Sequence, residues 1–555
     1  MDERVTAQAA QRSSNLPVKS TADIAIDGMI AAGIDTLFCL PGVQNDPFFD
    51  ALWHRQSALK PIQSRHEQGA AYMAMGAALA TGKPQACCLV PGIGFLNGAT
   101  AFATAYSTGA KVMILISQVP MAQIGRGYGA LHEVIDQSGI LRTMTKTSRR
   151  INSAFEAPQA IQTALNELVS GRPRPVGIEV PTDVWANAAP TAGLPEVEPQ
   201  VPPVDWPLIE RAASLLAKAE RPLIIVGGGA QDASKEVREL AERLQAPVSA
   251  FRMGLGVMDA RHALATPWGV AHQQWGATDV VLAIGTRMSV PYRGWGTDKN
   301  LTVIRIDIDA EEMARIERPT LGIVGDARAN VAALLEVLKP VGPRTMNADL
   351  PERRQKLAAR IESELPEQAG WVKALRTALP DNGVLVEELT QVAYVSRFAF
   401  PVYNPRSYIA SGFQGTLGWG VATAIGVKAA VKDRPVVSIS GDGGFMFTMP
   451  ELATAVRFKL PVVFVVFNDN AYGNVKRIQT EQFNGHTIAS DLTNPDFVKL
   501  ADSFGARSAR VTTPADLTKA ITAGLGADMP TVIEVPVGVM KTPFQFMNLP
   551  KVRGA

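Results

Sequence analysis

The sequence predicts an α/β protein of three doubly wound parallel-sheet domains. Short apolar runs rich in Val and Ile alternate with helical patterns along the 555 residues, which is typical of parallel sheets covered by helices on both faces. The chain is also too long for a single hydrophobic core. Two connecting segments divide it into three parts, each with its own alternation of strands and helices.

The connecting segments set the expected domain boundaries. Residues 188–207 carry six prolines, a composition typical of an extended linker. Residues 341–370 are proline-rich at first and then charged and helical. We therefore expect an N-terminal domain over residues 1–187, a central domain over 208–340 and a C-terminal domain over 371–555.

Within each part the expected strands are short and mostly apolar. The carboxyl ends of parallel strands lie along one edge of a sheet, where α/β folds bind ligands. The loops that follow these strands are therefore the first places to look for a site. The strands are expected at 35–42, 85–90, 111–117 and 176–180, at 222–229, 279–285 and 301–309, and at 384–386, 435–440 and 461–467.

The bulk composition is that of an ordinary globular protein. The net charge is +2, from 54 basic and 52 acidic side chains, so no strong field favours nucleic acid or an anionic membrane. No apolar run approaches the roughly 20 residues of a membrane helix, and the polar first 17 residues do not resemble a signal peptide. Cys39, Cys87 and Cys88 lack metal-ligand spacing and are expected to be buried reduced thiols of a cytoplasmic protein.

Two acidic loops in the C-terminal part are the most informative motif. Gly441-Asp442-Gly443-Gly444 follows the strand at 435–440, and Asn468-Asp469-Asn470-Ala471-Tyr472-Gly473 follows the strand at 461–467. Both loops are expected at the same edge of the sheet, with Asp442 and Asp469 separated by 27 residues. Hard oxygen ligands beside glycine-rich backbone suit Mg²⁺ shared with a diphosphate. The alternative for each loop alone is an acidic turn that caps the next helix.

This pair of loops resembles the thiamine diphosphate (ThDP) motif, which runs from Gly-Asp-Gly to a pair of asparagines at similar spacing. The resemblance implies that the Mg²⁺ ligands are Asp442, Asp469 and the backbone carbonyl of Ala471. The chain departs from the motif because Asp469 replaces the second asparagine, so Asn468 and Asn470 remain alternative ligands. The extra carboxylate is expected to raise the affinity for the cation, but it would lie close to the anionic diphosphate, so the departure is one of degree.

The order of the three parts resembles the pyrimidine-binding, central and diphosphate-binding domains of the acetolactate synthase-like ThDP enzymes. This superfamily includes pyruvate decarboxylase, benzoylformate decarboxylase and benzaldehyde lyase. The resemblance covers the chain from about residue 18 to residue 540.

The segment Ser64–Ala74 resembles the family segment whose glutamate activates ThDP, which implies this role for Glu67. ThDP reacts as a carbanion at C2, and its own aminopyrimidine removes the C2 proton. A carboxyl bonded to the pyrimidine ring favours the imino tautomer that performs this transfer. Without the resemblance, Glu67 is only a favourable charge in the first turn of a helix.

Further cofactor contacts are implied by position. The loop Gly412–Gly420 resembles the loop that carries the pyrimidine, where the Gly415 carbonyl would accept from the exocyclic amine and Leu417 would support the bent cofactor. Backbone amides at a helix start can bind the diphosphate. The remaining contacts implied are Thr390, Gln391, Gly441, Gly443, Gly444, Asn470, Tyr472 and Gly473.

Two segments of the N-terminal part are expected to line the substrate site. Pro91–Gly98 resembles the family's glycine loop. Gln118, His132 and Glu133 match positions where family members place a Gln, His or Glu near the reacting carbon. His132 is the candidate for proton transfer, because imidazole titrates near neutrality; the alternative is a surface or packing histidine.

The resemblance implies a ThDP- and Mg²⁺-dependent enzyme of lyase or transferase type. The leading hypothesis is a decarboxylase or carboligase that acts on a 2-oxo acid or aldehyde through a covalent adduct at C2 of ThDP. The alternatives are a lyase or decarboxylase of the 2-hydroxyacyl-CoA or oxalyl-CoA type, a ThDP- and FAD-dependent oxidase of the pyruvate oxidase type, and a noncatalytic ThDP-binding protein. The CoA-type alternative would need a site for CoA and the oxidase alternative a site for FAD.

A nucleotide in the central domain is the less favoured alternative. Gly227–Gly229 with Asp307 and Asp309 could bind FAD or another nucleotide, but no flavin-binding segment of the acetolactate synthase kind is found near Arg287. Ile478 stands where that enzyme has an aromatic residue. Both observations weaken a biosynthetic acetolactate synthase assignment.

The expected partners are a small carbonyl substrate and further copies of the chain. In the family, the glutamate of one subunit faces the diphosphate site of another. The resemblance therefore implies a homodimer or homotetramer with active sites at the subunit interface. The near-neutral charge favours neither nucleic acid nor membrane as a partner.

Overall fold

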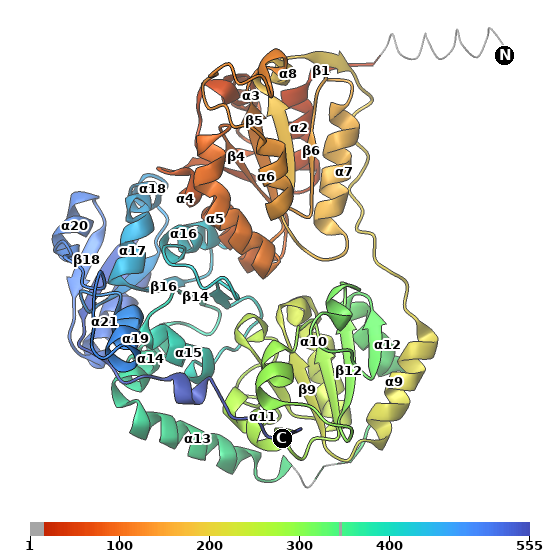
Figure 1. The fold of residues 1–555 in the computed structure, drawn as a ribbon, viewed down its shortest axis with the longest axis vertical. Helices are drawn as coiled ribbons and strands as arrows, with labels where there is room; N and C mark the ends of the chain where they lie inside the picture. The colour runs from red at the N-terminus through yellow and green to blue at the C-terminus, as the bar shows by residue number, and fades with distance from the viewer. Residues whose placement is uncertain (1–15, 343, 345–346, 555) are drawn as a thin grey trace. The chain divides into compact units, whose positions relative to one another are not determined.

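The computed structural model describes residues 16–342, 344 and 347–554. These residues form two compact units (Figure 1). The first unit extends to Gln200 and includes Ile425–Ala430, and the second contains Val201–Ala424 and the chain from Val431 onward. The first unit holds one six-stranded parallel sheet, and the second holds a five-stranded and a six-stranded parallel sheet. The prediction of three parallel-sheet α/β domains is confirmed.

The N-terminal sheet has the order β3-β2-β4-β5-β7-β6. Its central strands are buried along their whole length, which explains their continuous apolar sequences. The strands are β2 (Thr36–Cys39), β3 (Lys60–Gln63), β4 (Gln85–Leu89), β5 (Val112–Gln118), β6 (Thr147–Arg150) and β7 (Val176–Pro181). The helices are α2 (Thr21–Ala31), α3 (Asp46–Trp53), α4 (Glu67–Thr81), α5 (Ile93–Thr108), α6 (Gln137–Met144), α7 (Ala157–Val169) and α8 (Thr182–Trp185).

A two-stranded antiparallel ribbon joins the two ends of this unit. β1 (Val18–Ser20) pairs with β8 (Ala188–Pro190). Ser20 ends β1 and also caps α2, since its hydroxyl accepts from the Asp23 amide at 3.0 Å while its own amide donates to the Asp23 carboxylate at 3.2 Å. This capping box fixes where the first helix begins. β8 lies inside the segment expected as a linker.

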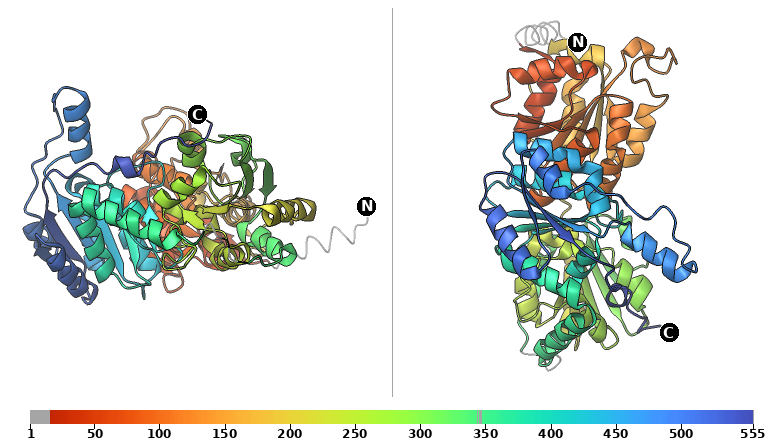
Figure 2. Two further views of the ribbon diagram at one scale, coloured as in Figure 1. Left: turned by 90° about the horizontal axis from the view of Figure 1, so that it is seen from below. Right: turned by 90° about the vertical axis from the view of Figure 1, so that its left-hand side faces the viewer.

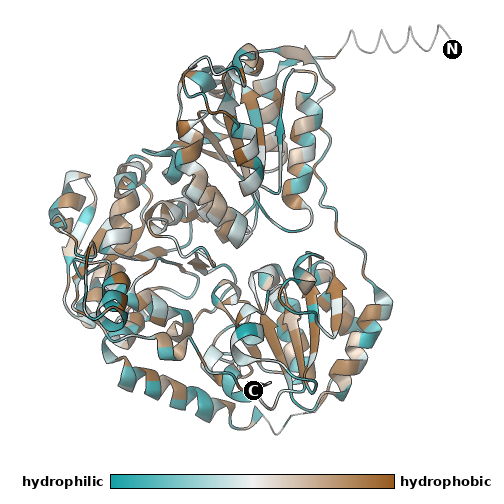
Figure 3. Cartoon of the chain, in the orientation of Figure 1, coloured by the Kyte–Doolittle hydropathy of each residue, from teal (hydrophilic) through white to brown (hydrophobic). Residues whose placement is uncertain are grey.

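The central sheet has the order β10-β9-β11-β12-β13. Alternate residues of β9 face two cores: Ile224 and Val226 belong to an aliphatic cluster, and Leu223 and Ile225 to a cluster rich in tryptophan. The strands are correspondingly the most hydrophobic segments of the domain (Figure 3). They are β9 (Pro222–Val226), β10 (Val248–Ala250), β11 (Val280–Ile284), β12 (Thr302–Asp307) and β13 (Leu321–Val324), with α9 (Trp206–Lys218), α10 (Ser234–Leu244), α11 (Trp268–Trp275) and α12 (Ala327–Val337).

The C-terminal sheet has the order β15-β14-β16-β17-β19-β18. α14 and α21 lie on one face of it and α17 and α18 on the other (Figure 1, Figure 2). The strands are β14 (Val384–Glu387), β15 (Tyr408–Ala410), β16 (Val436–Gly441), β17 (Val463–Asn468), β18 (Arg507–Arg510) and β19 (Thr531–Pro536). The helices are α13 (Leu350–Glu364), α14 (Pro366–Ala378), α15 (Gln391–Ala399), α16 (Gly420–Ala430), α17 (Asp442–Thr448), α18 (Leu452–Arg457), α19 (Gly473–Gln482), α20 (Phe497–Ser503) and α21 (Pro514–Leu525).

The sequence also predicted buried thiols and no membrane-spanning helix. Cys39, Cys87 and Cys88 are buried and form no disulfide, and burial raises the pKa of the Cys39 thiol to about 12. Across the part of the chain that the structure describes, every helix is too short or too polar to cross a bilayer.

Candidate cofactor site

The two acidic loops lie side by side at the carboxyl edge of the C-terminal sheet. β16 and β17 are adjacent parallel strands, with Gly441 paired with Phe467. Asp442 follows β16 as the first residue of α17, and Asp469 follows β17 directly. The side chain of Asp442 is almost fully buried, at 2% exposure. The structure therefore brings together the two carboxylates that the sequence singled out.

Ionisation of both carboxylates is unfavourable in the folded protein. Partial burial and the nearby charge of Asp442 raise the pKa of Asp469 to about 6. Burial also raises the pKa of Asp442. Two close, partly buried carboxylates repel each other, and a bound cation would relieve that repulsion.

Asn494 gathers the oxygen atoms of both loops. Its Nδ2 donates to Asp442 Oδ2 at 2.6 Å, to Asn468 Oδ1 at 3.0 Å and to Asn470 Oδ1 at 3.3 Å. One carboxylate oxygen and two amide oxygens thus point toward one position. Nothing in the sequence indicated Asn494, because it is a single polar residue outside both loops.

This donor set fits Mg²⁺. Among residues 16–342, 344 and 347–554, no three His, Cys, Asp or Glu side chains gather as they would in a zinc centre. Mg²⁺ accepts carboxylate, amide and backbone carbonyl oxygens and keeps some of its ligands for phosphate. Asp442, Asp469 and the carbonyl of Ala471 would hold it. Ala471 is held in place by a backbone bridge to Asp491.

The glycines of the two loops are needed for their close packing. A Cβ on Gly473 would lie 2.3 Å from Asp469 Oδ2, and a Cβ on Gly443 would lie 2.7 Å from the ring of Tyr472. Asn470 adopts a left-handed conformation, with φ of 54°. Both loops are therefore folded tightly against each other, and the predicted residues Gly443, Tyr472 and Gly473 all belong to this contact.

The start of α15 lies beside the first acidic loop. A Cβ on Gly441 would lie 3.9 Å from the Thr390 side chain. Thr390 is the N-cap of α15 and makes no side-chain capping bond, and Gln391 Oε1 is buried without a hydrogen-bond partner among the described residues. The unpaired amides at this helix start could bind an anion, as the resemblance predicted for Thr390 and Gln391.

The loop predicted to receive the pyrimidine connects β15 to α16. Gly412, Gly415 and Gly418 all have positive φ, between 57° and 77°, which explains the glycines. Gly415 is exposed and Leu417 is half-buried. Arg252 Nη1 donates to the Gly412 carbonyl at 2.8 Å, so the loop is held at its beginning by the central domain.

In the N-terminal unit, Glu67 begins α4 and contacts the glycine loop. Its side chain is buried, at 9% exposure, and Glu67 Oε2 accepts from Asn97 Nδ2 at 3.0 Å. A Cβ on Gly94 would lie 3.1 Å from Glu67 Oε1. The segment Pro91–Gly98, which the sequence predicted at the site, therefore holds the glutamate in place; the contact of its Asn97 with Glu67 was not predicted.

The same glycine loop contacts His132. Gly92 has φ of 57°, and a Cβ there would lie 2.0 Å from the His132 carbonyl oxygen. Gln137 Oε1 accepts from the Gly92 amide at 2.6 Å. His132 itself has φ of 64°, and its Nδ1 is buried with no hydrogen-bond partner among the residues described. The structure thus brings His132 to the loop that contacts Glu67.

Gln118 and Glu133 are engaged elsewhere. Gln118 Nε2 donates to Glu179 Oε1 at 2.6 Å, and Gln118 Oε1 accepts from the Val119 amide at 2.8 Å. Glu133 accepts from the amides of Ala130 at 3.0 Å and Gly127 at 2.9 Å, and these backbone bonds lower its pKa. Both side chains support the fold around them in this structure, and neither contact brings them to Glu67.

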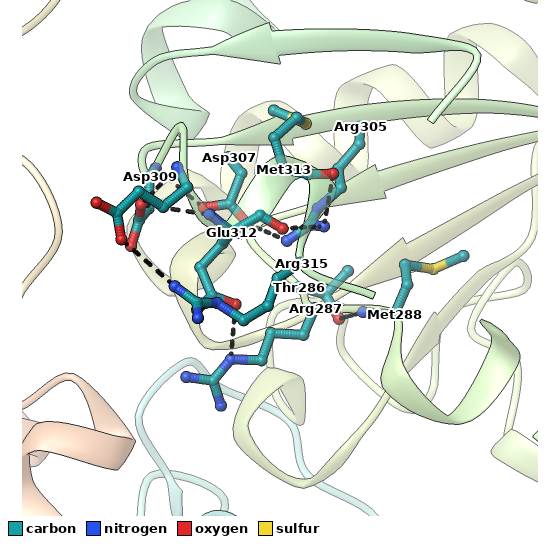
Figure 4. A network of polar contacts seen from close by, with 10 residues as sticks. Thr286, Arg287, Met288, Arg305, Asp307, Asp309, Glu312, Met313 and Arg315 are labelled. Atoms are coloured by element: carbon teal, nitrogen blue, oxygen red, sulfur yellow. Dashed lines mark hydrogen bonds and ion pairs between the residues drawn. The ribbon is translucent and has the colours of Figure 1, made fainter. Parts of the chain in front are cut away.

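The nucleotide candidates of the central domain also have structural contacts. Gly227 and Gly229 donate to the carbonyls of Ile284 and Gly285 at 3.0 and 3.1 Å, so the glycine segment packs directly on the loop after β11. Asp307 accepts from the fully buried Arg305 at 2.7 Å. In the same polar network the Glu312 carboxylate pairs with Arg287 at 3.0 Å and with Arg315 at 2.7 Å (Figure 4). Asp309 donates its amide to the Asp307 carboxylate at 3.1 Å.

Comparisons with known proteins agree with this arrangement. Family models described as the N-terminal TPP binding domain, the central domain and the C-terminal TPP binding domain of thiamine pyrophosphate enzymes match residues 19–140, 209–334 and 390–535. A probable 2-ketoarginine decarboxylase of Pseudomonas aeruginosa is 32% identical over 529 residues, covering 91% of each chain. A probable acetolactate synthase large subunit of Methanocaldococcus jannaschii is 32% identical over 93% of this chain and 91% of its own, and the acetolactate synthase of Bacillus subtilis is 29% identical over 96% and 95%. The chain belongs to the thiamine diphosphate-dependent enzymes that combine an N-terminal, a central and a C-terminal domain.

Proposed function

We propose that the protein is a ThDP- and Mg²⁺-dependent decarboxylase or carboligase that acts on a 2-oxo acid or an aldehyde. The observation that carries the proposal is the convergence of Asp442, Asp469 and the amide oxygens of Asn468 and Asn470 at one sheet edge. When bound, ThDP supplies a carbon nucleophile for carbonyl groups. The protein residues bind the cofactor and control protons around it.

The roles proposed for the residues follow their surroundings. Asp442, Asp469 and the Ala471 carbonyl hold the cation, and the amides at the starts of α15 and α17 bind the diphosphate. Glu67, buried and oriented by Asn97, bonds the aminopyrimidine and favours its imino form. His132 is the candidate for moving a proton near the substrate.

The substrate class is supported by the relatives. One is named as a probable decarboxylase of a 2-keto acid, and others are named as acetolactate synthases. Both names concern small oxo compounds, so a 2-oxo acid is the donor we propose. Decarboxylation alone and decarboxylation followed by ligation to a second carbonyl are the two reactions to distinguish.

We also propose that the protein functions as a homodimer or homotetramer with active sites at the subunit interface. Apolar side chains next to the residues that hold Glu67 are exposed in the single chain: Ile93 at 58% and Leu96 at 41%. Leu131 and Ile135, on either side of His132 and Glu133, are exposed at 60% and 96%. Exposed apolar side chains of this kind mark interaction surfaces. Light scattering during gel filtration should give the mass of at least two chains, and a monomer would contradict the proposal.

The cofactor assignment is tested by isothermal titration calorimetry of the metal-free protein with ThDP, with and without Mg²⁺. Tight binding that requires Mg²⁺ is expected, and Asp442→Asn should weaken it strongly. Asp433→Asn is the matched control, because Asp433 is exposed and precedes β16 at the opposite edge of the same sheet. Absence of ThDP binding by the wild-type protein would overturn the proposal.

The substrate assignment is tested by CO₂ release. The loaded protein is offered a panel of 2-oxo acids that includes pyruvate and 2-ketoarginine, with and without an acceptor aldehyde. Release of CO₂ would identify the donor, and a ligated product would identify the carboligase reaction. Tight ThDP binding without CO₂ from any member of the panel would contradict a 2-oxo acid as the donor.

A further inference from the structure

A buried carboxylate that the proposed mechanism does not use lies beside the cofactor loops. Glu388 follows β14 directly and has an exposure of 0%. Neither the acidic motif nor any predicted contact includes it. A buried carboxylate is costly for a folded protein unless hydrogen bonds satisfy it, so the partners of Glu388 indicate why it is there.

Both oxygens of Glu388 bind the end of the loop predicted to receive the pyrimidine. Glu388 Oε1 accepts from the Gly418 amide at 2.6 Å, and Glu388 Oε2 accepts from the Gly420 amide at 2.8 Å. Hydrogen bonds from amides to a carboxylate are among the stronger ones in proteins. Gly418 has φ of 77°, a conformation that favours glycine at this point of the loop. The carboxylate thus fixes where the loop ends and α16 begins.

The other side of the same carboxylate faces the helix that begins at Asp442. A Cβ on Gly444 would lie 1.9 Å from Glu388 Oε1, so Gly444 leaves the space that the carboxylate fills. Later in the same helix, the Thr448 hydroxyl donates to the Gly418 carbonyl at 2.8 Å. The pyrimidine loop and the metal-bearing helix therefore meet at Glu388 and Gly418.

The loop is held separately at its beginning. Arg252 donates to the Gly412 carbonyl, and Arg252 lies near the buried Glu387. Between the two anchors, Phe413, Gln414 and Gly415 are exposed. The Phe413 ring packs against Arg287, whose Cζ lies 4.7 Å from the ring centroid. Gln414 and Gly415 are therefore the part of the loop open to a ligand, while Glu388 fixes the end of the loop at Gly418 and Gly420.

We propose that Glu388 is a positioning residue for the cofactor. Its carboxylate sets the distance between α17, which begins at Asp442, and the loop predicted to receive the pyrimidine. Both ends of one ligand can then bind without rearrangement of the loop. This inference rests on the proposed function, because the ligand it concerns is ThDP.

The test compares two ligands in two variants. Glu388→Gln keeps the size of the side chain but presents an amide hydrogen donor to one of the two loop amides, and Glu388→Asp keeps the charge but is too short to reach both. Tyr408→Phe is the control, because it removes a buried hydrogen bond to Ser396 in the same domain without touching the bonds of the loop. Calorimetry then gives the affinities of each protein for Mg²⁺-ThDP and for Mg²⁺-pyrophosphate, which has no pyrimidine.

The loss of one buried hydrogen bond in the loop should weaken ThDP binding on the order of tenfold. Pyrophosphate binding should change by less than about threefold, because the residues that bind it are intact. Tyr408→Phe should leave the ratio of the two affinities at its wild-type value. If the Glu388 variants bound both ligands equally more weakly than the wild type, or bound ThDP with unchanged affinity, the inference would be overturned.

Hydrogen exchange of the ligand-free protein gives a second readout that does not depend on ThDP. Both Glu388 variants should exchange the amides of Gly418–Gly420 faster, while those of β16 stay protected as in the wild type. Unchanged exchange in the loop would overturn the role of Glu388 whatever the protein binds. Failure of the wild-type protein to bind Mg²⁺-ThDP, with faster loop exchange in the variants, would instead overturn the proposed function and with it the cofactor role of Glu388.

Discussion

Replacing Asp469 with asparagine should stabilise the metal-free protein at neutral pH. Burial and the charge of Asp442 raise the pKa of Asp469 to about 6 from its ordinary value of 3.8. Ionising such a group costs the folded state up to ~3 kcal/mol. Because Asp469 is only partly buried, solvent screening reduces this, and we expect Asp469→Asn to raise the free energy of unfolding by about 1–2 kcal/mol.

The increase in the free energy of unfolding caused by Asp469→Asn should depend on pH in a defined direction. Between pH 3.8 and about 6 the folded protein holds a proton on Asp469 that the unfolded chain has lost. The contribution of this group to stability therefore falls as the pH rises through that window and reaches its full penalty above it. Asparagine has no such dependence. The difference in the free energy of unfolding between the variant and the wild type should be near zero at pH 4 and largest at pH 7.5.

Urea denaturation in the presence of EDTA measures this difference at both pH values. Asp433→Asn, an exposed aspartate of the same domain, should change the free energy of unfolding by less than about 0.5 kcal/mol at either pH. At pH 7.5 saturating Mg²⁺ should make the wild type more stable than Asp469→Asn, because two carboxylates bind the cation more tightly than one. A variant that is less stable than the wild type at pH 7.5 without Mg²⁺, or equally stabilised at both pH values, would refute the electrostatic reasoning.

Three further changes have definite expected outcomes. Glu67→Gln should leave the free energy of unfolding nearly unchanged but slow C2 proton exchange of bound ThDP by roughly 10²-fold or more, measured by NMR; unchanged exchange would exclude Glu67 as the activating group. Asp442→Ala should abolish Mg²⁺-dependent retention of ThDP in gel filtration, and normal retention would place the metal elsewhere. Arg397 pairs with the buried Glu387 at 2.6 Å. Arg397→Met should lower the free energy of unfolding by roughly 3–5 kcal/mol because it removes the ion-pair partner of this buried carboxylate, and adding Glu387→Met should restore most of the lost stability in urea denaturation. A double variant as unstable as the single one would contradict that explanation.

The sequence predicts most of the three sheets because most of their central strands are buried on both faces, although the interior strand β19, buried at five of its six residues, was not expected. β5 and β17 are buried at every residue, so their apolar runs are continuous. Edge strands are harder to predict. β6 and β18 have only four residues each, of mixed exposure, and their sequences resemble those of loops, so neither was expected as a strand.

The candidate site could be predicted where its residues are close in sequence. Asp442 and Asp469 each lie in a short loop after an apolar strand, and the spacing of the loops is visible in the sequence. The contacts of Asn97, Asn494 and Glu388 were not predicted, because each is a single polar residue whose partners are 24 to 52 residues away. Their roles depend on which loops meet at the sheet edge, and sequence spacing does not determine that.

For two residues the resemblance suggested a position in the site but did not predict their contacts. Gln118 and Glu133 occupy positions that family members use near the reacting carbon, yet both are engaged by neighbours in their own domain. A matching position fixes the residue type but not its hydrogen-bond partners. For Gln118 the partner is the buried Glu179, which nothing in the sequence connects with it.

The pairing of β1 with β8 constrains when the N-terminal unit can fold during synthesis. Val18 pairs with Pro190 and Ser20 with Ala188, so the first strand leaves the ribosome long before its partner. At roughly 5–20 residues per second the interval is on the order of 10–30 s, during which the β1 edge has nothing to pair with. We therefore expect this unit to close in a late step, after β8 has emerged, and nascent chains that stop before β8 to remain susceptible to proteases near β1.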